Sequence, residues 1–145
     1  MPWLITSWVS WLNNLTNPMT RPKITLWHLT TTANPAADRN RITILSGELP
    51  VSGQMGGGSI HVDLRYIADR DVITAPTLAA YFEAAARETC ETLEAYADMV
   101  LNDLNNELVP RWIWLRLQSG GHKVIQQDRQ PSWDNNGLLA TIDFS

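Results

Sequence analysis

The stretch that most constrains the fold of this chain is residues 94–112, where a helical pattern ends at a proline and a strand pattern begins. Apolar side chains recur three or four positions apart, as on one buried face of a helix: Leu93, Tyr96, Ala97, Val100, Leu101, Leu104 and Leu108. The opposite side is polar: Glu94, Asp98, Asn102 and Asn105. Pro110 stops the helix and restricts Val109 to extended backbone, so residues 111–117 are predicted to form a strand.

Length and composition bound the class of protein. At 145 residues the chain fits one domain, which we expect over residues 23–145, after a Trp-rich N-terminal extension over residues 1–22. The net charge is -4, and Lys and Arg are scattered singly, which argues against a nucleic-acid partner. Cys90 is the single cysteine, so no disulfide forms within the chain, and no Cys/His spacing indicates zinc. We expect a cytoplasmic protein without a metal.

The N-terminal extension is apolar but lacks the basic start of a signal peptide, since no charge precedes Arg21. The chain has no uninterrupted apolar run of about 18 residues, so we expect no transmembrane helix. A helix here would gather one apolar side: Leu4, Trp8, Trp11, Leu12 and Leu15. Docking on a neighbouring subunit or partner, a poorly ordered extension and a membrane-surface helix all remain open, although the missing Lys and Arg weaken the last.

The remaining pattern predicts strands on both sides of two helices. Alternation and turn residues indicate strands at residues 23–32, 41–45, 59–68, 122–127 and 137–144, in addition to 111–117. A first helix begins after Thr74, and Thr89 is the expected N-cap of the helix that contains Glu94, with Glu91 near its positive end. We therefore expect an α+β fold, in which an antiparallel sheet of about four strands carries two consecutive helices on one face.

Residues 49–58, Leu-Pro-Val-Ser-Gly-Gln-Met-Gly-Gly-Gly, are the least ordinary stretch. Three successive glycines allow positive φ and let the backbone approach a ligand or a neighbouring chain. A hairpin loop or a bulge at the sheet edge explains the same composition without a ligand. Composition leaves both interpretations open.

The motif Pro50-Val51-Ser52-Gly53-Gln54, followed by Asn-Asp-Leu at residues 102–104 and Pro-Arg-Trp at residues 110–112, resembles the queuosine-pathway nitrile reductases (QueF) of the tunnelling or T-fold superfamily. The resemblance covers roughly residues 38–125. It implies a T-fold subunit, whose sheets join edge to edge into a homo-oligomeric ring with ligand sites between subunits.

The resemblance also implies lost chemistry. The position of the family's catalytic Cys is Leu49, and that of its catalytic Asp falls near Gly56. The first helix of the family carries a lysine-containing segment associated with the nicotinamide cofactor, but residues 74–81 here contain no lysine. We expect a pseudoenzyme that reduces no nitrile and uses no cofactor.

Ligand binding is the function that the resemblance leaves in place. It assigns Glu94 to the carboxylate that accepts hydrogen bonds from a purine or pterin ring, with Ser52, Gly53 and Gln54 of the motif loop beside the ligand. An ionised carboxylate can pair with two adjacent N–H donors. A solvated helical Glu is the alternative, and the His that precedes this Glu in the family is Leu93 here.

Two functions from different classes follow. The first is a reductase-incompetent QueF-like protein that binds a purine-like or deazaguanine-like molecule at subunit interfaces. The second is a structural, self-assembling T-fold ring or tube without ligand chemistry, which seven tryptophans favour. An enzyme with rebuilt chemistry ranks last, because no nucleophile, base and orienting group can be named.

Other reactive side chains have ordinary explanations. Another T-fold branch, the pyruvoyl-tetrahydropterin synthases, binds zinc through a tight His-x-His pair, whereas His28, His61 and His122 are far apart in this sequence. We expect strand histidines without a metal and a partly buried Cys90 without an activating neighbour.

Overall fold

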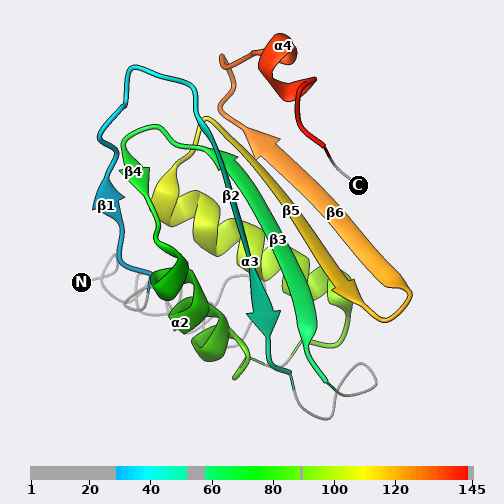
Figure 1. Ribbon diagram of the computed structural model, residues 1–145. Coiled ribbons are helices and arrows are strands. Elements are labelled where there is room, and N and C mark those ends of the chain that lie inside the picture. The colour runs from blue at the N-terminus through cyan, green and yellow to red at the C-terminus, as the bar shows by residue number, and fades with distance from the viewer. Residues whose placement is uncertain (1–28, 52–57, 89, 144–145) are drawn as a thin grey trace, which may run out of the picture.

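The computed structural model describes residues 29–51, 58–88 and 90–143 of the chain (Figure 1). The elements in chain order are β1 (Thr32–Ala33), β2 (Ile42–Leu49), β3 (Ile60–Ile67), β4 (Asp71–Val72), α2 (Ala75–Ala85), α3 (Leu93–Leu108), β5 (Trp112–Ser119), β6 (His122–Arg129) and α4 (Asn136–Leu139). The predicted N-terminal extension and most of the strand predicted at residues 23–32 lie outside the described residues.

The principal sheet has four antiparallel strands in the order β2-β3-β5-β6, and β1 and β4 form a separate two-stranded sheet. The helices α2 and α3 follow one another between β3 and β5 and cover one face of the four-stranded sheet (Figure 1). The prediction of an α+β fold with a four-stranded antiparallel sheet and two consecutive helices is confirmed.

Alternation along the strands divides this sheet into two faces. The helix face is apolar, and its fully buried residues form one core with the apolar sides of α2 and α3: Val62, Leu64, Tyr66, Ile113, Leu115, Leu117, Leu78, Phe82, Leu93, Tyr96, Val100, Leu104 and Leu108. The opposite face, called the outer face below, is formed by the alternate residues: Ile42, Ile44, Ser46, Glu48, His61, Asp63, Arg65, Ile67, Trp112, Trp114, Arg116, Gln118, Lys123, Ile125, Gln127 and Arg129.

The helix α3 begins one turn later than predicted. Its N-cap is Thr92, whose hydroxyl accepts a hydrogen bond from the Ala95 N–H at 3.1 Å. The expected cap, Thr89, lies outside the described residues, and Glu91 precedes the helix, so the acidic residue of the first turn is Glu94 instead. The N-cap predicted for α2, Thr74, is confirmed by the bond that its hydroxyl accepts from the Thr77 N–H.

The C-terminus of α3 falls at Leu108, before the proline, but Val109 is not extended as predicted. It adopts the left-handed conformation, with φ 42° and ψ 56°. This conformation lets the Val109 N–H donate to the Asn105 carbonyl at 2.9 Å, while the Val109 carbonyl accepts from Gln130 Nε2 at 3.2 Å. The cap therefore satisfies backbone groups that an extended residue would leave to solvent.

Two residues of the sequence motifs, Asp103 and Arg111, connect elements of the fold through hydrogen bonds. Asp103 is buried in α3, and its Oδ2 accepts a hydrogen bond from the Tyr81 hydroxyl of α2 at 2.7 Å. Burial, together with the Asp103 carboxylate, raises the pKa of Tyr81 well above its ordinary value, so the phenol stays a donor. Arg111 donates to the Arg39 carbonyl and contacts Asp69 Oδ1 at 3.3 Å, which fixes the turn before β2 against the start of β5.

The prediction of a strand at residues 137–144 is wrong for the residues that the structure describes, up to Asp143. Asn135 caps the short helix α4 instead, by accepting from the Leu138 N–H at 3.1 Å. Leu138 and Ile142 pack on the outer face against a cluster that contains Trp112 and Trp114. Leu138 and Leu139 reach this cluster from α4, and Ile142 reaches it from the segment after the helix, an arrangement that the alternating sequence pattern did not reveal.

The strand β2 is longer than the predicted 41–45, because residues after Leu45 continue the pairing with β3 as far as Leu49. Gly47 lies on the helix face beneath the ring of Phe82, and a Cβ at Gly47 would stand 2.9 Å from Phe82 Cε2. The missing side chain therefore lets α2 pack closely on the sheet.

We predict that Gly47→Ala lowers the free energy of unfolding by about 1–3 kcal/mol, because the ring of Phe82 must move out of a packed core. Denaturant midpoints at constant slope measure this change. The matched control is Gly121→Ala, since a Cβ at Gly121 meets nothing within 4 Å. Equal midpoints for the two variants would contradict the close contact.

Candidate functional site

The residues predicted to form the ligand site fall into two groups. Ser52, Gly53 and Gln54 lie outside the described residues. Leu49 ends β2 in the core with no exposed surface, and Glu94 lies in the first turn of α3. Of the four residues predicted to bind a ligand, the structure thus describes only Glu94.

Glu94 contacts the hairpin of β5 and β6, at the first residue of β6. Its Oε1 atom lies 2.7 Å from Nε2 of His122, the first residue of β6, and both side chains are about half exposed, at 55% and 51%. Gly120, with φ 59°, supplies the left-handed residue of the turn that brings His122 back towards α3. The carboxylate also stands at the positive end of the helix dipole.

The pair belongs to a row of polar contacts between α3 and β6. Asp98 Oδ1 accepts from Gln126 Nε2 at 2.7 Å, one helical turn after Glu94. Further along, Asn105 Nδ2 donates to Asp128 Oδ2 at 2.8 Å. Glu94, Asp98 and Asn105 therefore each have their own partner on β6, and Glu94 and Asp98 do not act as one pair of carboxylates.

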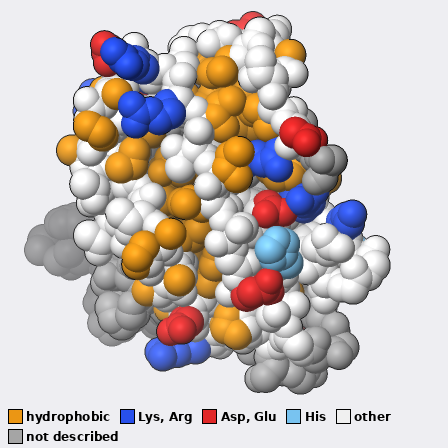
Figure 2. Space-filling model, in the orientation of Figure 1, with side chains coloured by type: hydrophobic (Ala, Val, Ile, Leu, Met, Phe, Trp, Pro, Cys, Tyr) orange, Lys and Arg blue, Asp and Glu red, His pale blue; other side chains and the backbone are white. Residues whose placement is uncertain are grey.

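A second cluster, which sequence reasoning did not identify, lies on the outer face. Glu48 Oε1 stands 2.8 Å from Nδ1 of His61, while Glu48 Oε2 accepts from the Ser59 hydroxyl at 2.7 Å. On its other side, His61 Nε2 lies 3.4 Å from Asp63 Oδ1, and Arg116 donates to Asp63 Oδ2 at 3.1 and 2.5 Å. Figure 2 shows a histidine between acidic side chains on this face.

The sequence contained only part of the signal for this outer-face cluster. The spacing of His61 and Asp63 places them on one side of β3, but Glu48 joins them only because the register of the sheet sets it opposite His61. The hydrogen bond with Glu48 and, to a lesser extent, the Asp63 charge raise the pKa of His61 above its ordinary value. The hydrogen bonds with His61 and Ser59 lower the pKa of Glu48.

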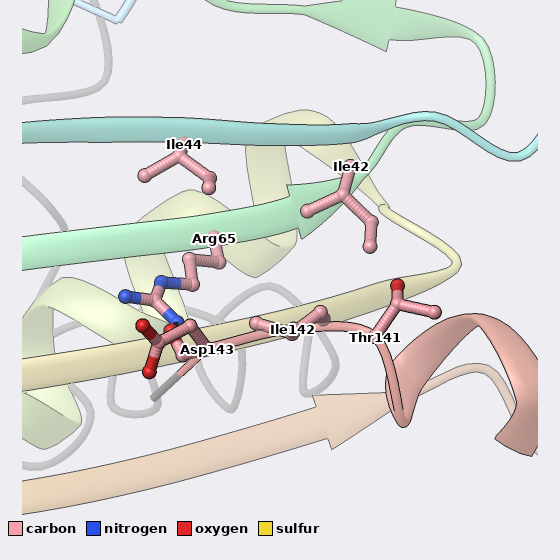
Figure 3. Close-up of a pocket in the computed structure, with 6 residues that line it drawn as sticks. All are labelled: Ile42, Ile44, Arg65, Thr141, Ile142 and Asp143. Atoms are coloured by element: carbon pink, nitrogen blue, oxygen red, sulfur yellow. Dashed lines mark hydrogen bonds between the residues drawn. The ribbon is translucent and has the colours of Figure 1, made fainter. Parts of the chain in front are cut away.

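A pocket of about 400 Å³ lies elsewhere on the outer face, between β2 and the C-terminal segment (Figure 3). Its lining is Ile42, Ile44, Arg65, Thr141, Ile142 and Asp143. The guanidinium of Arg65 stacks on Trp114, with Cζ 4.8 Å from the ring centroid, and Nη1 donates to the Asp143 carbonyl. Because this pocket and Glu94 are on different faces, they are separate features.

Within the described ranges, no group of three or more His, Cys, Asp or Glu residues is arranged to hold a metal ion. His61 and His122 lie on different faces of the sheet, and His28 is outside these ranges. Cys90, the single cysteine, is partly buried and forms no disulfide within the chain. Likewise, none of the helices in the part of the chain that the structure describes is long and apolar enough to span a bilayer.

Comparison of the sequence with protein-family models gives no match, and neither does comparison with curated proteins. The class of protein therefore rests on the fold, on the row of contacts between α3 and β6, and on the outer-face cluster. The chain is an α+β protein with a four-stranded antiparallel sheet and two helices on one face of that sheet. The Glu94 carboxylate lies at the start of α3, beside β6.

We predict that His61→Gln lowers stability most between pH 4.5 and pH 6.5, which are the ordinary pKa values of Glu and His. Folding raises the pKa of His61, so the protonated side chain stabilises the fold fully below pH 6.5. This contribution is lost as the pH rises through the pKa of His61 in the folded protein. Lowering the pKa of Glu48 contributes stability that is present above 4.5 and is lost as pH falls. Both side chains are about half exposed, so the largest effect is below about 1 kcal/mol.

Thermal melts of the wild type, His61→Gln and Glu48→Gln across this pH range measure the effect. Both variants should flatten the profile, because either change removes the contact between the two side chains, while Glu48→Gln keeps the effect of Asp63 on His61 and His61→Gln keeps the effect of Ser59 on Glu48. A constant difference from the wild type at all pH values would contradict this account.

Proposed function

We propose that this chain is a T-fold subunit related to the queuosine-pathway nitrile reductases. It no longer reduces nitriles, and it binds a purine-like or deazaguanine-like molecule between subunits, with Glu94 as the anchor. The single observation that carries the proposal is the half-exposed Glu94 carboxylate, in the first turn of α3 and beside β6, an outermost strand of the sheet.

The order of elements supports the T-fold part of the proposal. In the region of the resemblance, β2 and β3 precede two consecutive helices, and β5 and β6 follow them. Such a subunit has an outermost strand on each side of its sheet, which a neighbour can extend in an edge-to-edge ring. A ligand next to β6 then lies where two subunits meet.

The chemistry at Glu94 suits a ring with two adjacent N–H donors. An ionised carboxylate accepts at both oxygens, and the N-terminal turn of α3 favours the negative charge. Since His122 contacts Oε1, a ligand that pairs with both oxygens takes the place of this contact. The exchange of one hydrogen bond for two is the proposed source of selectivity.

The loss of reductase chemistry is supported by burial and by charge. The side chain of Leu49 is enclosed in the core, and a hydrocarbon cannot attack a nitrile. The helix α2, Ala-Pro-Thr-Leu-Ala-Ala-Tyr-Phe-Glu-Ala-Ala, contains no Lys or Arg that could pair with the phosphates of a nicotinamide cofactor.

We predict no oxidation of NADPH that depends on a cyano-deazaguanine substrate. Leu49→Cys alone should not restore turnover, because the proton-transfer carboxylate of the family is also missing near Gly56. Absorbance of the reduced nicotinamide over time is the measurement. Substrate-dependent turnover by the wild type would overturn the prediction.

We predict that Glu94→Gln weakens ligand binding by about one to two decades, because one acceptor becomes a donor that faces a donor and a charged hydrogen bond of roughly 1.5–3 kcal/mol is lost. Calorimetric titration with guanine, deazaguanine and pterin compounds measures this change. The matched control is Glu83→Gln, an exposed helical Glu of α2 on which the proposed site does not depend. Thermal melts should show that both variants keep the fold.

A structural ring without a ligand is the second candidate function. One observation favours it: the Glu94 carboxylate already has a partner, His122, within its own chain. If the wild type binds none of these compounds and Glu94→Gln assembles normally in sedimentation, the binding proposal fails and the structural function takes its place.

A further inference from the structure

The pocket on the outer face has a polar end and apolar sides (Figure 3). Arg65 and Asp143 lie together at one end, and Thr141 lies at the other. Isoleucines form the sides between these ends: Ile42 and Ile44 from β2, and Ile142 from the C-terminal segment. The volume of about 400 Å³ is near the lower end of the range for ligand sites, roughly 300–1,000 Å³. The pocket therefore suits a small molecule.

Contacts within the chain hold the walls of this pocket in place. The Arg65 guanidinium stacks on Trp114, with Cζ 4.8 Å from the ring centroid, and its Nη1 donates to the Asp143 carbonyl. At the other end, Thr141 Oγ1 donates to the Leu138 carbonyl at 2.6 Å. The pocket is therefore formed before a ligand arrives, and binding has to order few side chains.

The charges at the polar end balance one another. Among the described residues that line the pocket, Arg65 is the cation and Asp143 is the anion. A guanidinium pairs with a carboxylate through its fork of N–H donors, and a carboxylate accepts hydrogen bonds from an ammonium group. Because Arg65 is only 9% exposed, a ligand with a single charge would leave an excess charge where solvent has little access. A zwitterion adds no net charge.

The isoleucines define the rest of the ligand. Ile44 is 60% exposed, the largest exposed fraction among the large apolar side chains that the structure describes. Ile42 and Ile142 are partly buried beside it. An aliphatic group between these walls removes apolar surface of all three side chains from water, whereas a polar group there would lose its hydration without gaining a partner.

We propose that this pocket binds a free α-amino acid with a branched aliphatic side chain, such as leucine. The α-carboxylate pairs with Arg65, and the α-ammonium group pairs with Asp143. The aliphatic side chain lies between Ile42, Ile44 and Ile142. A guanidinium carries five N–H donors, so Arg65 can keep its bond to the Asp143 carbonyl and also hold the ligand's carboxylate.

This site is independent of the one proposed at Glu94. It lies on the outer face of the sheet, whereas Glu94 belongs to α3, which covers the other face. The segment that supplies Asp143 also lies beyond residues 38–125, over which the sequence resembles the nitrile reductases. An amino acid is therefore a second, different ligand, and either site can be occupied without the other.

Equilibrium dialysis of the full chain with radiolabelled L-leucine tests the inference, and unlabelled compounds measure competition. Each competitor lacks one of the three recognised groups. Isocaproate lacks the ammonium group, isoamylamine lacks the carboxylate, and glycine lacks the aliphatic group. We expect each to bind at least about tenfold more weakly than leucine, because each leaves a charged group or the isoleucine walls without a partner.

Two variants with matched controls locate the site. Asp143→Asn keeps the backbone carbonyl and the shape but removes the charge that pairs with the ammonium group, so leucine binding should weaken about tenfold or more. Its control is Asp38→Asn, at an exposed Asp in the loop before β2. Ile44→Thr keeps a β-branched side chain but loses apolar contact, so leucine binding should weaken about threefold to tenfold. Its control is Ile125→Thr on β6, which is 55% exposed and does not line the pocket.

Three results would overturn the inference. They are no binding of leucine by the wild type at millimolar concentration, equal binding of isocaproate and leucine, and a change in Asp143→Asn or Ile44→Thr no larger than in its control. The competitor series uses the wild type, so it decides even where thermal melts show that a variant does not fold. Failure at Glu94 is distinguishable, because titration with guanine, deazaguanine and pterin compounds can be negative while the chain retains leucine in dialysis.

Discussion

Burial of one side of α3 against the sheet is the interaction on which the rest of the structure depends. Leu93, Tyr96, Val100, Leu104 and Leu108 have almost no exposed surface, and each buried apolar side chain of this size contributes about 1.5–3 kcal/mol. Once this side is fixed against the sheet, the polar side of the helix must reach β6. The row of contacts that begins with the Glu94 carboxylate is a consequence of that packing.

The two faces of the sheet follow different rules. The helix face forms the apolar core, while the outer face combines charged pairs with an aromatic cluster that the C-terminal segment covers. Trp114 stands between two guanidinium groups, those of Arg65 and Arg116, so charge and apolar surface share one layer. A face of this composition can remain partly open, whereas the helix face cannot.

Local patterns predicted most elements because periodicity reports which side of an element is buried. They failed where a distant partner decided the outcome. Residues 137–144 alternate like a strand in the sequence, yet the structure has the short helix α4 at Asn136–Leu139, because apolar side chains of this segment pack on a tryptophan cluster of β5. Val109 precedes a proline, yet it turns left-handed because Gln130 and the last turn of α3 bond its backbone. The outer-face cluster of Glu48 and His61 was missed for the same reason.

The sequence by itself determined the class of fold and the end of α3 before Pro110. These are properties of single positions and of short-range spacing. Only the tertiary structure decided that Glu94 meets His122, because the register of a hairpin 28 residues away sets that contact. Which side chains share a face is written in the local pattern, but which face meets which edge depends on how the whole sheet is assembled.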